Sequence, residues 1–137
     1  MRKTLILFMM TGVLLGACGR KEMPQVDTGK PPHIEALKHD MAGNSLRLTF
    51  ALLGGSGPVG YQIDRAEIDP HCNCPAFWQR YLDQPAIRGQ KGKVLSRTLN
   101  LRTYKRAFAF RIRAVDSFGN IGVWSKPILA RAEKMME

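Results

Sequence analysis

From residue 31 onward, short runs of alternating apolar and polar residues limit the folds open to this chain more than any other feature. The runs SLRLTF, GYQIDRAEI, KVLSRTLNL and FAFRIRAVD alternate with the period of two that is typical of half-buried strands. Segments rich in Gly, Asn, Ser and Pro, such as DMAGNS, LLGGSGPVG and DSFGN, separate the runs as turns require. This pattern predicts an all-β sandwich of about seven strands over residues 31–131, with a tail at residues 132–137.

The strongest run predicts which side chains face the core. In FAFRIRAVD, the apolar residues Phe108, Phe110, Ile112 and Ala114 share one face, and Arg111 and Arg113 lie on the other. A weaker first strand is expected at residues 33–39 and a last strand at residues 121–129. The segment PAFWQRYLDQ, residues 75–84, is compatible with a short helical turn or with another strand.

The order of these runs resembles that of a fibronectin type III domain. Pro31-Pro32 stands before the first strand, LRLTF resembles the second strand, and GPVGYQIDRAE resembles the third strand with its Gly-Tyr entry. FAFRIRAVDSFGNIGVWS resembles the sixth strand, its turn and the last strand, which ends at Ser125. The resemblance covers residues 31–130 and implies an immunoglobulin-like sandwich. It implies little about function, because this fold carries many unrelated binding roles.

The first residues have the layout of an export signal. Arg2 and Lys3 precede an apolar stretch from Thr4 to Leu15, and small residues follow it. This stretch is shorter than the roughly 20 residues that a membrane-spanning helix needs. Residues 1–17 are therefore expected to form a signal helix that is cleaved.

The end of the signal, Leu15-Gly16-Ala17-Cys18, resembles the lipobox of bacterial lipoproteins. That resemblance implies cleavage before Cys18, a diacylglycerol thioether on its sulfur and a further acyl chain such as palmitate. The alternative is an ordinary secretory signal with an unrelated cysteine. Gly19 stands where an Asp would resemble the inner-membrane retention signal, which favours the periplasmic face of the outer membrane. Residues 18–30 are expected to be the lipidated N-terminus and a flexible tether.

Two cysteines remain after Cys18, and both lie in the segment PHCNCP. The flanking prolines place this segment in a loop or at a sheet edge. A Cys72–Cys74 disulfide agrees with the even number of remaining cysteines in an oxidising compartment. The other interpretations are a pair of free or separately used thiols and a soft-metal site formed by His71, Cys72 and Cys74.

The formal net charge is +10, and the sequence from residue 84 to residue 115 contains nine basic residues and no Asp or Glu. Such a segment attracts polyanions unless it is simply a solvated face. In the cell envelope the partners would be anionic lipid or glycan or the acidic face of an envelope protein, and no nucleic acid is expected. The candidate polyanion-binding residues are Arg97, Arg102, Lys105, Arg106, Arg111 and Arg113. Arg97, Arg111 and Arg113 are expected to share one sheet face.

No motif in the sequence indicates catalysis. Three carboxylates follow the third strand and are expected to face solvent: Asp64, Glu67 and Asp69. The two tryptophans, Trp78 and Trp124, are expected to contribute to packing. The sequence therefore predicts a non-catalytic binding or scaffolding module without a cofactor other than its covalent lipid. The alternative is a thiol-redox or soft-metal-handling envelope protein that uses His71, Cys72 and Cys74.

Overall fold

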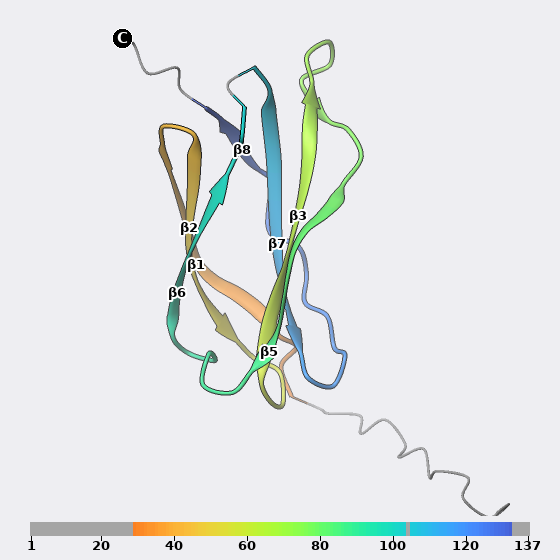
Figure 1. Ribbon diagram of the computed structural model, residues 1–137. Coiled ribbons are helices and arrows are strands. Elements are labelled where there is room, and N and C mark those ends of the chain that lie inside the picture. Colours follow the sequence, from red (N-terminus) through yellow and green to blue (C-terminus); the bar gives the residue numbers. More distant parts are fainter. Residues whose placement is uncertain (1–28, 104, 133–137) are drawn as a thin grey trace, which may run out of the picture.

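The computed structural model describes residues 29–103 and 105–132. Its strands are β1 (His33–Ala42), β2 (Ser45–Leu53), β3 (Val59–Asp69), β4 (Cys74–Pro75), β5 (Gln79–Ile87), β6 (Val94–Asn100), β7 (Ala107–Asp116) and β8 (Ile128–Arg131). One antiparallel sheet has the order β1-β2-β6, and the second has the order β4-β3-β7-β8 with β5 also paired to β3. The sheets lie face to face (Figure 1), so the predicted all-β sandwich is confirmed.

The alternating runs form the core because every second side chain of a strand points to the same face. In β2 the residues Leu46, Leu48, Phe50 and Leu52 are buried, while Arg47 between them is exposed. The inward face that was predicted for β7 is confirmed, with Phe108, Phe110, Ile112 and Ala114 all buried. Phe50 of one sheet contacts Tyr61 of the other edge to face, with ring centroids 5.0 Å apart.

The main hydrophobic core contains residues from β2 to Ala132, and none of its members precedes Leu46. Ala132, at the expected border between domain and tail, is itself buried against this core. Ile34, Leu37 and Met41 of β1 are partly buried against this core, so both sheets of the described part contribute to it. The described residues contain no helix, and hence none that is long and apolar enough to cross a membrane.

The last strand is shorter than predicted. Residues 121–127 lie alongside β7 but form only scattered hydrogen bonds with it. Gly122 N donates to Ala114 O and Ser125 N donates to Ile112 O, and regular pairing resumes when β8 begins at Ile128. Pro127 lacks the N–H that a regular ladder would need at this point. A side chain at Gly122 would collide with the backbone of Pro32, so this segment requires glycine.

The segment whose structure the sequence left open, residues 75–84, is mostly extended. Its second half enters β5, which pairs with β3 across the registers Ile63↔Leu82 and Tyr61↔Gln84. β5 lies at the sheet edge, and Pro85 is accommodated there.

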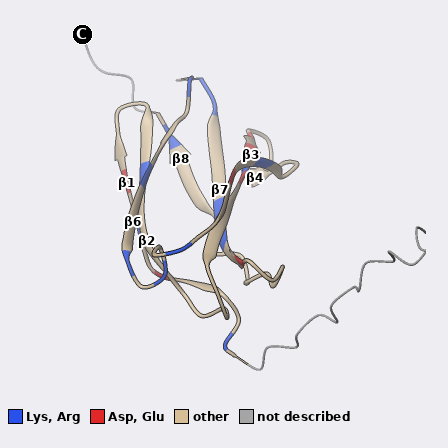
Figure 2. Ribbon diagram, turned by 60° about the horizontal axis from the view of Figure 1, so that its bottom comes forward, with Lys and Arg blue, Asp and Glu red and all other residues tan. Residues whose placement is uncertain are grey.

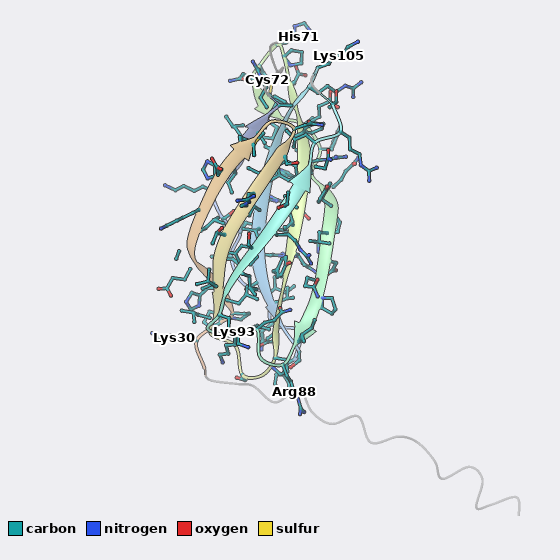
Figure 3. All side chains as sticks on the ribbon, turned by 60° about the vertical axis from the view of Figure 1, so that its left-hand side comes forward. Lys30, His71, Cys72, Arg88, Lys93 and Lys105 are labelled. Atoms are coloured by element: carbon teal, nitrogen blue, oxygen red, sulfur yellow. A yellow bond between two sulfur atoms is a disulfide. The ribbon has the colours of Figure 1, made fainter. Side chains whose placement is uncertain are left out.

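Two opposite ends of the sandwich are used below. The base comprises the loops 54–58, 88–93 and 117–121, and the described chain begins there at Gly29. The distal end comprises the turn at residues 43–44 and the loops 70–73 and 101–106. Figure 3 shows Lys30, Arg88 and Lys93 at the base, and His71, Cys72 and Lys105 at the distal end. The eleven-residue strand β3 runs between the two ends and spans about 35 Å.

Candidate functional site

The six basic residues proposed as one polyanion site do not form one surface. Lys and Arg are spread over both ends and over several strands of the sandwich (Figure 2). The six divide into three groups with different surroundings: Arg97 on β6, the pair Arg111 and Arg113 on β7, and the loop residues Arg102, Lys105 and Arg106. Contrary to the prediction, Arg97 belongs to the other sheet from Arg111 and Arg113.

Arg97 joins the two sheets. The alternation of β6 puts it on the same side as Leu95 and Leu99, which contact the core. Its Nε donates a hydrogen bond of 2.8 Å to Tyr61 Oη, and its Nη2 donates one of 2.8 Å to Gln84 Oε1. These contacts satisfy the hydroxyl of a buried tyrosine. Arg97 is therefore a structural residue that closes the side of the sandwich between β6 and β5.

Arg111 and Arg113 belong to a stack of aromatic rings and guanidinium groups on the outer face of the β3–β7 sheet. The guanidinium carbon of Arg111 lies 4.3 Å from the ring centroids of both Trp78 and Trp124, and that of Arg113 lies 4.3 Å from Trp124. Such distances allow cation–π attraction. We call Trp78, Arg111, Trp124 and Arg113 the Trp–Arg stack.

A buried carboxylate lies against the Trp–Arg stack. Asp64 is 5% exposed; its Oδ1 accepts from Arg80 Nε at 2.7 Å and its Oδ2 from Arg111 Nη2 at 3.0 Å. The expectation that Asp64 faces solvent was therefore wrong. The two arginines explain its burial, since a buried carboxylate needs paired, hydrogen-bonded cations.

Arg113 is held by a neutral partner. Its Nε donates to Gln62 Oε1 at 2.9 Å. Desolvation by partial burial, and after it the positive charge of Arg80, lower the pKa of the Arg113 guanidinium from its ordinary value. Arg111 and Arg113 thus have partners within the molecule, and the stack is better suited to fixing this face of the sheet than to capturing a polyanion.

The sequence contains a signal for this stack. Arg111 and Arg113 are two residues apart on one strand face, and the tryptophans flank that strand in the sequence. The predicted packing role of the tryptophans agrees with their half-buried positions. What was missed is that arginines, not apolar residues, are their packing partners.

The three loop residues of the predicted site do lie together, at the distal end. Arg102, Lys105 and Arg106 are exposed, and Arg131 at the end of β8 adds a fourth exposed cation. Among these four, Arg106 forms an ion pair, 2.8 Å long, with Glu67. A pocket of about 390 Å³ is lined by Lys105, Arg106, Arg131, Glu67, Pro70 and Asn73, among others.

Cys72 and Cys74 form a disulfide in the β3–β4 turn of the distal end, with their Cα atoms 5.2 Å apart. Asn73 between them has a φ of 53°, a conformation that Asn tolerates better than most residues. Its N donates to Asp69 O at 2.8 Å, and His71 N donates to Asp69 Oδ1 at 2.8 Å. The turn is therefore held by its own hydrogen bonds as well as by the disulfide.

The structure does not bring His71, Cys72 and Cys74 together as metal ligands. Both sulfur atoms are bonded to each other, so neither is a free thiolate. Within residues 29–103 and 105–132, no group of three or more His, Cys, Asp or Glu side chains is placed to hold a metal ion. The lipidation candidate Cys18, the signal at residues 1–17 and most of the tether lie outside the described residues.

Comparison with known proteins supports the fold. No family model matches the chain, and no curated protein matches it. A solved structure titled "Myokine structure" is similar with a TM-score of 0.55 and 13% sequence identity, over 77% of this chain and 100% of that one. At this identity, the likeness concerns the fold alone.

Proposed function

We propose that this chain is a lipid-anchored binding or scaffolding module of the bacterial cell envelope, with no catalytic role. The lipobox-like Leu15-Gly16-Ala17-Cys18 supports an acylated N-terminus on the periplasmic face of the outer membrane. The strand order and the motifs quoted above support a fibronectin type III-like identity for the sandwich. Such a domain contributes loops and sheet edges for binding.

The distal end is the proposed binding surface. The observation that carries this proposal is the cluster of exposed cations Arg102, Lys105, Arg106 and Arg131 at the end opposite to the one where the chain enters. A tether at the base leaves this end about 35 Å farther from the anchor. A group at the distal end can therefore reach a partner while the lipid stays in the membrane.

The chemistry of the distal end fits an acidic group of an envelope partner, either a carboxylate-bearing glycan or an acidic protein face. Arg106 already pairs with Glu67, with both side chains well exposed. An exposed pair of this kind contributes little to stability. It can therefore be exchanged for a partner's carboxylate at small cost, while Arg102, Lys105 and Arg131 provide long-range attraction.

The test is site-directed photo-crosslinking in the native host. A crosslinker placed at Lys105 should give one discrete covalent adduct with the envelope partner in intact cells. A crosslinker at Arg88 of the base should not give that adduct. The triple substitution Arg102→Gln, Lys105→Gln, Arg131→Gln should weaken the cellular role of the protein. It should also lower the yield of the adduct that forms from a crosslinker at Asn73. The triple substitution Arg47→Gln, Lys38→Gln, Lys126→Gln is the charge-matched control. Equal effects of both triples would contradict the assignment of the distal end.

A thiol-redox function is the second candidate, because the disulfide lies in a turn where Cys72 and Cys74 are both exposed. Exposed disulfides are more easily reached by thiols than buried ones. This function predicts that Cys72→Ser with Cys74→Ser abolishes the cellular role, whereas the binding function predicts that the role is retained. Metal analysis of the purified protein with and without reductant tests the soft-metal form of this alternative.

A further inference from the structure

The base of the sandwich carries a second set of cations, outside the six residues named as polyanion-binding candidates. Lys30, Arg88, Lys91 and Lys93 are all exposed there. Figure 3 shows Lys30, Lys93 and Arg88 at this end of the sandwich. In the part of the chain that the structure describes, none of the four forms an ion pair.

Hydrogen bonds hold this set in one place. Gly55 N donates to Lys30 O at 2.8 Å, and Lys91 Nζ donates to Gly55 O at 2.6 Å. Gly92 N donates to Leu52 O at 2.9 Å. The beginning of the described chain, the β2–β3 loop and the β5–β6 loop are therefore joined at the base.

The same end also exposes large apolar side chains. Phe118 is 58% exposed and Ile121 is 55% exposed, both in the loop that follows β7. This loop contacts the β2–β3 loop, because Ser117 N donates to Pro58 O at 3.0 Å. Val94, next to Lys93, is 74% exposed. Apolar side chains and cations at one end match a membrane surface, whose anionic head groups cover an apolar interior.

The nearest carboxylates do not cancel this charge. Asp116 at the end of β7 is 6% exposed and accepts hydrogen bonds from Asn120 and Phe118. Glu35 is exposed, but its register partner is Ala51, so it lies on the side of the sandwich and not at its tip. The base therefore keeps a positive surface.

We infer that the base of the sandwich, through Lys30, Arg88, Lys91, Lys93 and the side chains of Phe118 and Ile121, binds the surface of a bilayer containing anionic phospholipid. Lys30 is the twelfth residue after Cys18 in the sequence, and a fully extended chain of that length reaches about 40 Å. The inference rests on the proposed lipid anchor, because an anchored chain that enters at the base places that end of the domain nearest to the membrane. A second, electrostatic contact would keep the domain against the membrane and point its distal end outward.

The test uses residues 19–137, which contain all of the described residues but not Cys18, so that no acyl chain contributes. The protein is sedimented with vesicles of phosphatidylethanolamine and phosphatidylglycerol, and separately with neutral phosphatidylcholine vesicles. We expect binding to the anionic vesicles that weakens as salt is added. The triple substitution Lys30→Gln, Arg88→Gln, Lys93→Gln should weaken it about tenfold or more.

The control is the triple substitution Arg102→Gln, Lys105→Gln, Arg131→Gln, which removes the same charge from the distal end and should change binding less than about threefold. For the apolar contact, Phe118→Ser should weaken binding and Phe77→Ser, at another exposed phenylalanine, should not. Circular dichroism verifies that each variant is folded.

Equal losses from the two triple variants, or no binding by the parent protein, would overturn the inference. Sedimentation with purified peptidoglycan that the base triple variant abolishes and the distal triple variant leaves unchanged would also overturn it, because the base would then bind a glycan. Because the protein tested lacks Cys18, these results are independent of lipidation. Failure to find lipid on Cys18 in the native host would refute the proposed anchor and leave the vesicle result unchanged.

Discussion

Arg111 Nη2 lies 3.0 Å from Asp64 Oδ2, in a pairing that joins the two central strands β3 and β7 across their register positions 64 and 111. The same guanidinium stacks between Trp78 and Trp124. One arginine thus neutralises a buried carboxylate and provides a flat packing surface for two rings. The outer face of this sheet is ordered by polar and aromatic contacts and not by a second apolar core.

Asp64→Asn should destabilise the protein. The substitution removes the negative charge from between Arg80 and Arg111 while those guanidiniums stay half buried. We therefore expect the free energy of unfolding to fall by about 2–3 kcal/mol, which is less than for a fully buried ion pair. Urea unfolding measures it. Asp83→Asn is the control, because Asp83 is 57% exposed and lies 3.6 Å from Arg80; it should cost less than about 1 kcal/mol. A similar cost for both variants would contradict a special role for Asp64.

The Trp–Arg stack should show energetic coupling. In a double-mutant cycle of Trp124→Leu and Arg113→Met, both replacements keep apolar bulk but remove the cation–π contact. We expect a coupling free energy of about 0.5–1 kcal/mol in urea unfolding. The same cycle with Lys126→Met in place of Arg113→Met provides a comparison. Strictly additive effects of Trp124 and Arg113 would mean that their stacking does not contribute to stability.

Asp116 should make stability depend on acid pH. Burial alone raises the pKa of Asp116, but hydrogen bonds from the side chain and backbone of Asn120 and from Phe118 N outweigh it and leave the pKa below its ordinary value. A carboxyl whose pKa falls on folding stabilises the protein above its unfolded pKa, and this contribution is lost as the pH falls through the folded pKa.

The comparison is between the wild type and Asp116→Asn, with unfolding free energies measured from about pH 7 to about pH 3. The wild type should be more stable near neutral pH by on the order of 1 kcal/mol, and the difference should shrink below about pH 4. A difference that stays constant or grows in acid would contradict the lowered pKa.

The disulfide should matter little for the stability of the sandwich. Cys72 and Cys74 are two residues apart in an exposed turn, so their bond restricts a very short loop. Replacing both with Ser should cost less than about 2 kcal/mol in urea unfolding. Leu48→Ala in the buried core, by contrast, should cost about 2–5 kcal/mol. A Cys pair that costs as much as the core substitution would show that the turn supports the whole domain.

The sequence predicted the strands better than it predicted their surfaces. Alternation is enough to place Phe110 and Ile112 inward, because the period of a strand fixes the face of each side chain. It does not tell which sheet a strand joins, and so Arg97 was grouped with Arg111 although they belong to different sheets. Strand pairing is decided by contacts between distant residues, such as the pairing of Leu48 with Arg97 between β2 and β6, that no local pattern contains.

The candidate surfaces were harder to predict for the same reason. The cations Arg102, Lys105 and Arg106 are neighbours in the sequence, and their clustering followed from it. Asp64 was assigned to solvent because its two cationic partners come from β5 and β7, 16 and 47 residues away. Of the base cations, Arg88, Lys91 and Lys93 lie in one loop, and the fold adds Lys30 and the apolar side chains of the loop that follows β7.

The central claim, a lipid-anchored envelope module, is tested most directly by mass spectrometry of the protein purified from membranes of its native host. The account predicts an N-terminus at Cys18 that carries diacylglycerol on its sulfur. A chain that retains residues 1–17, or a mature chain whose Cys18 sulfur carries no lipid, would contradict it.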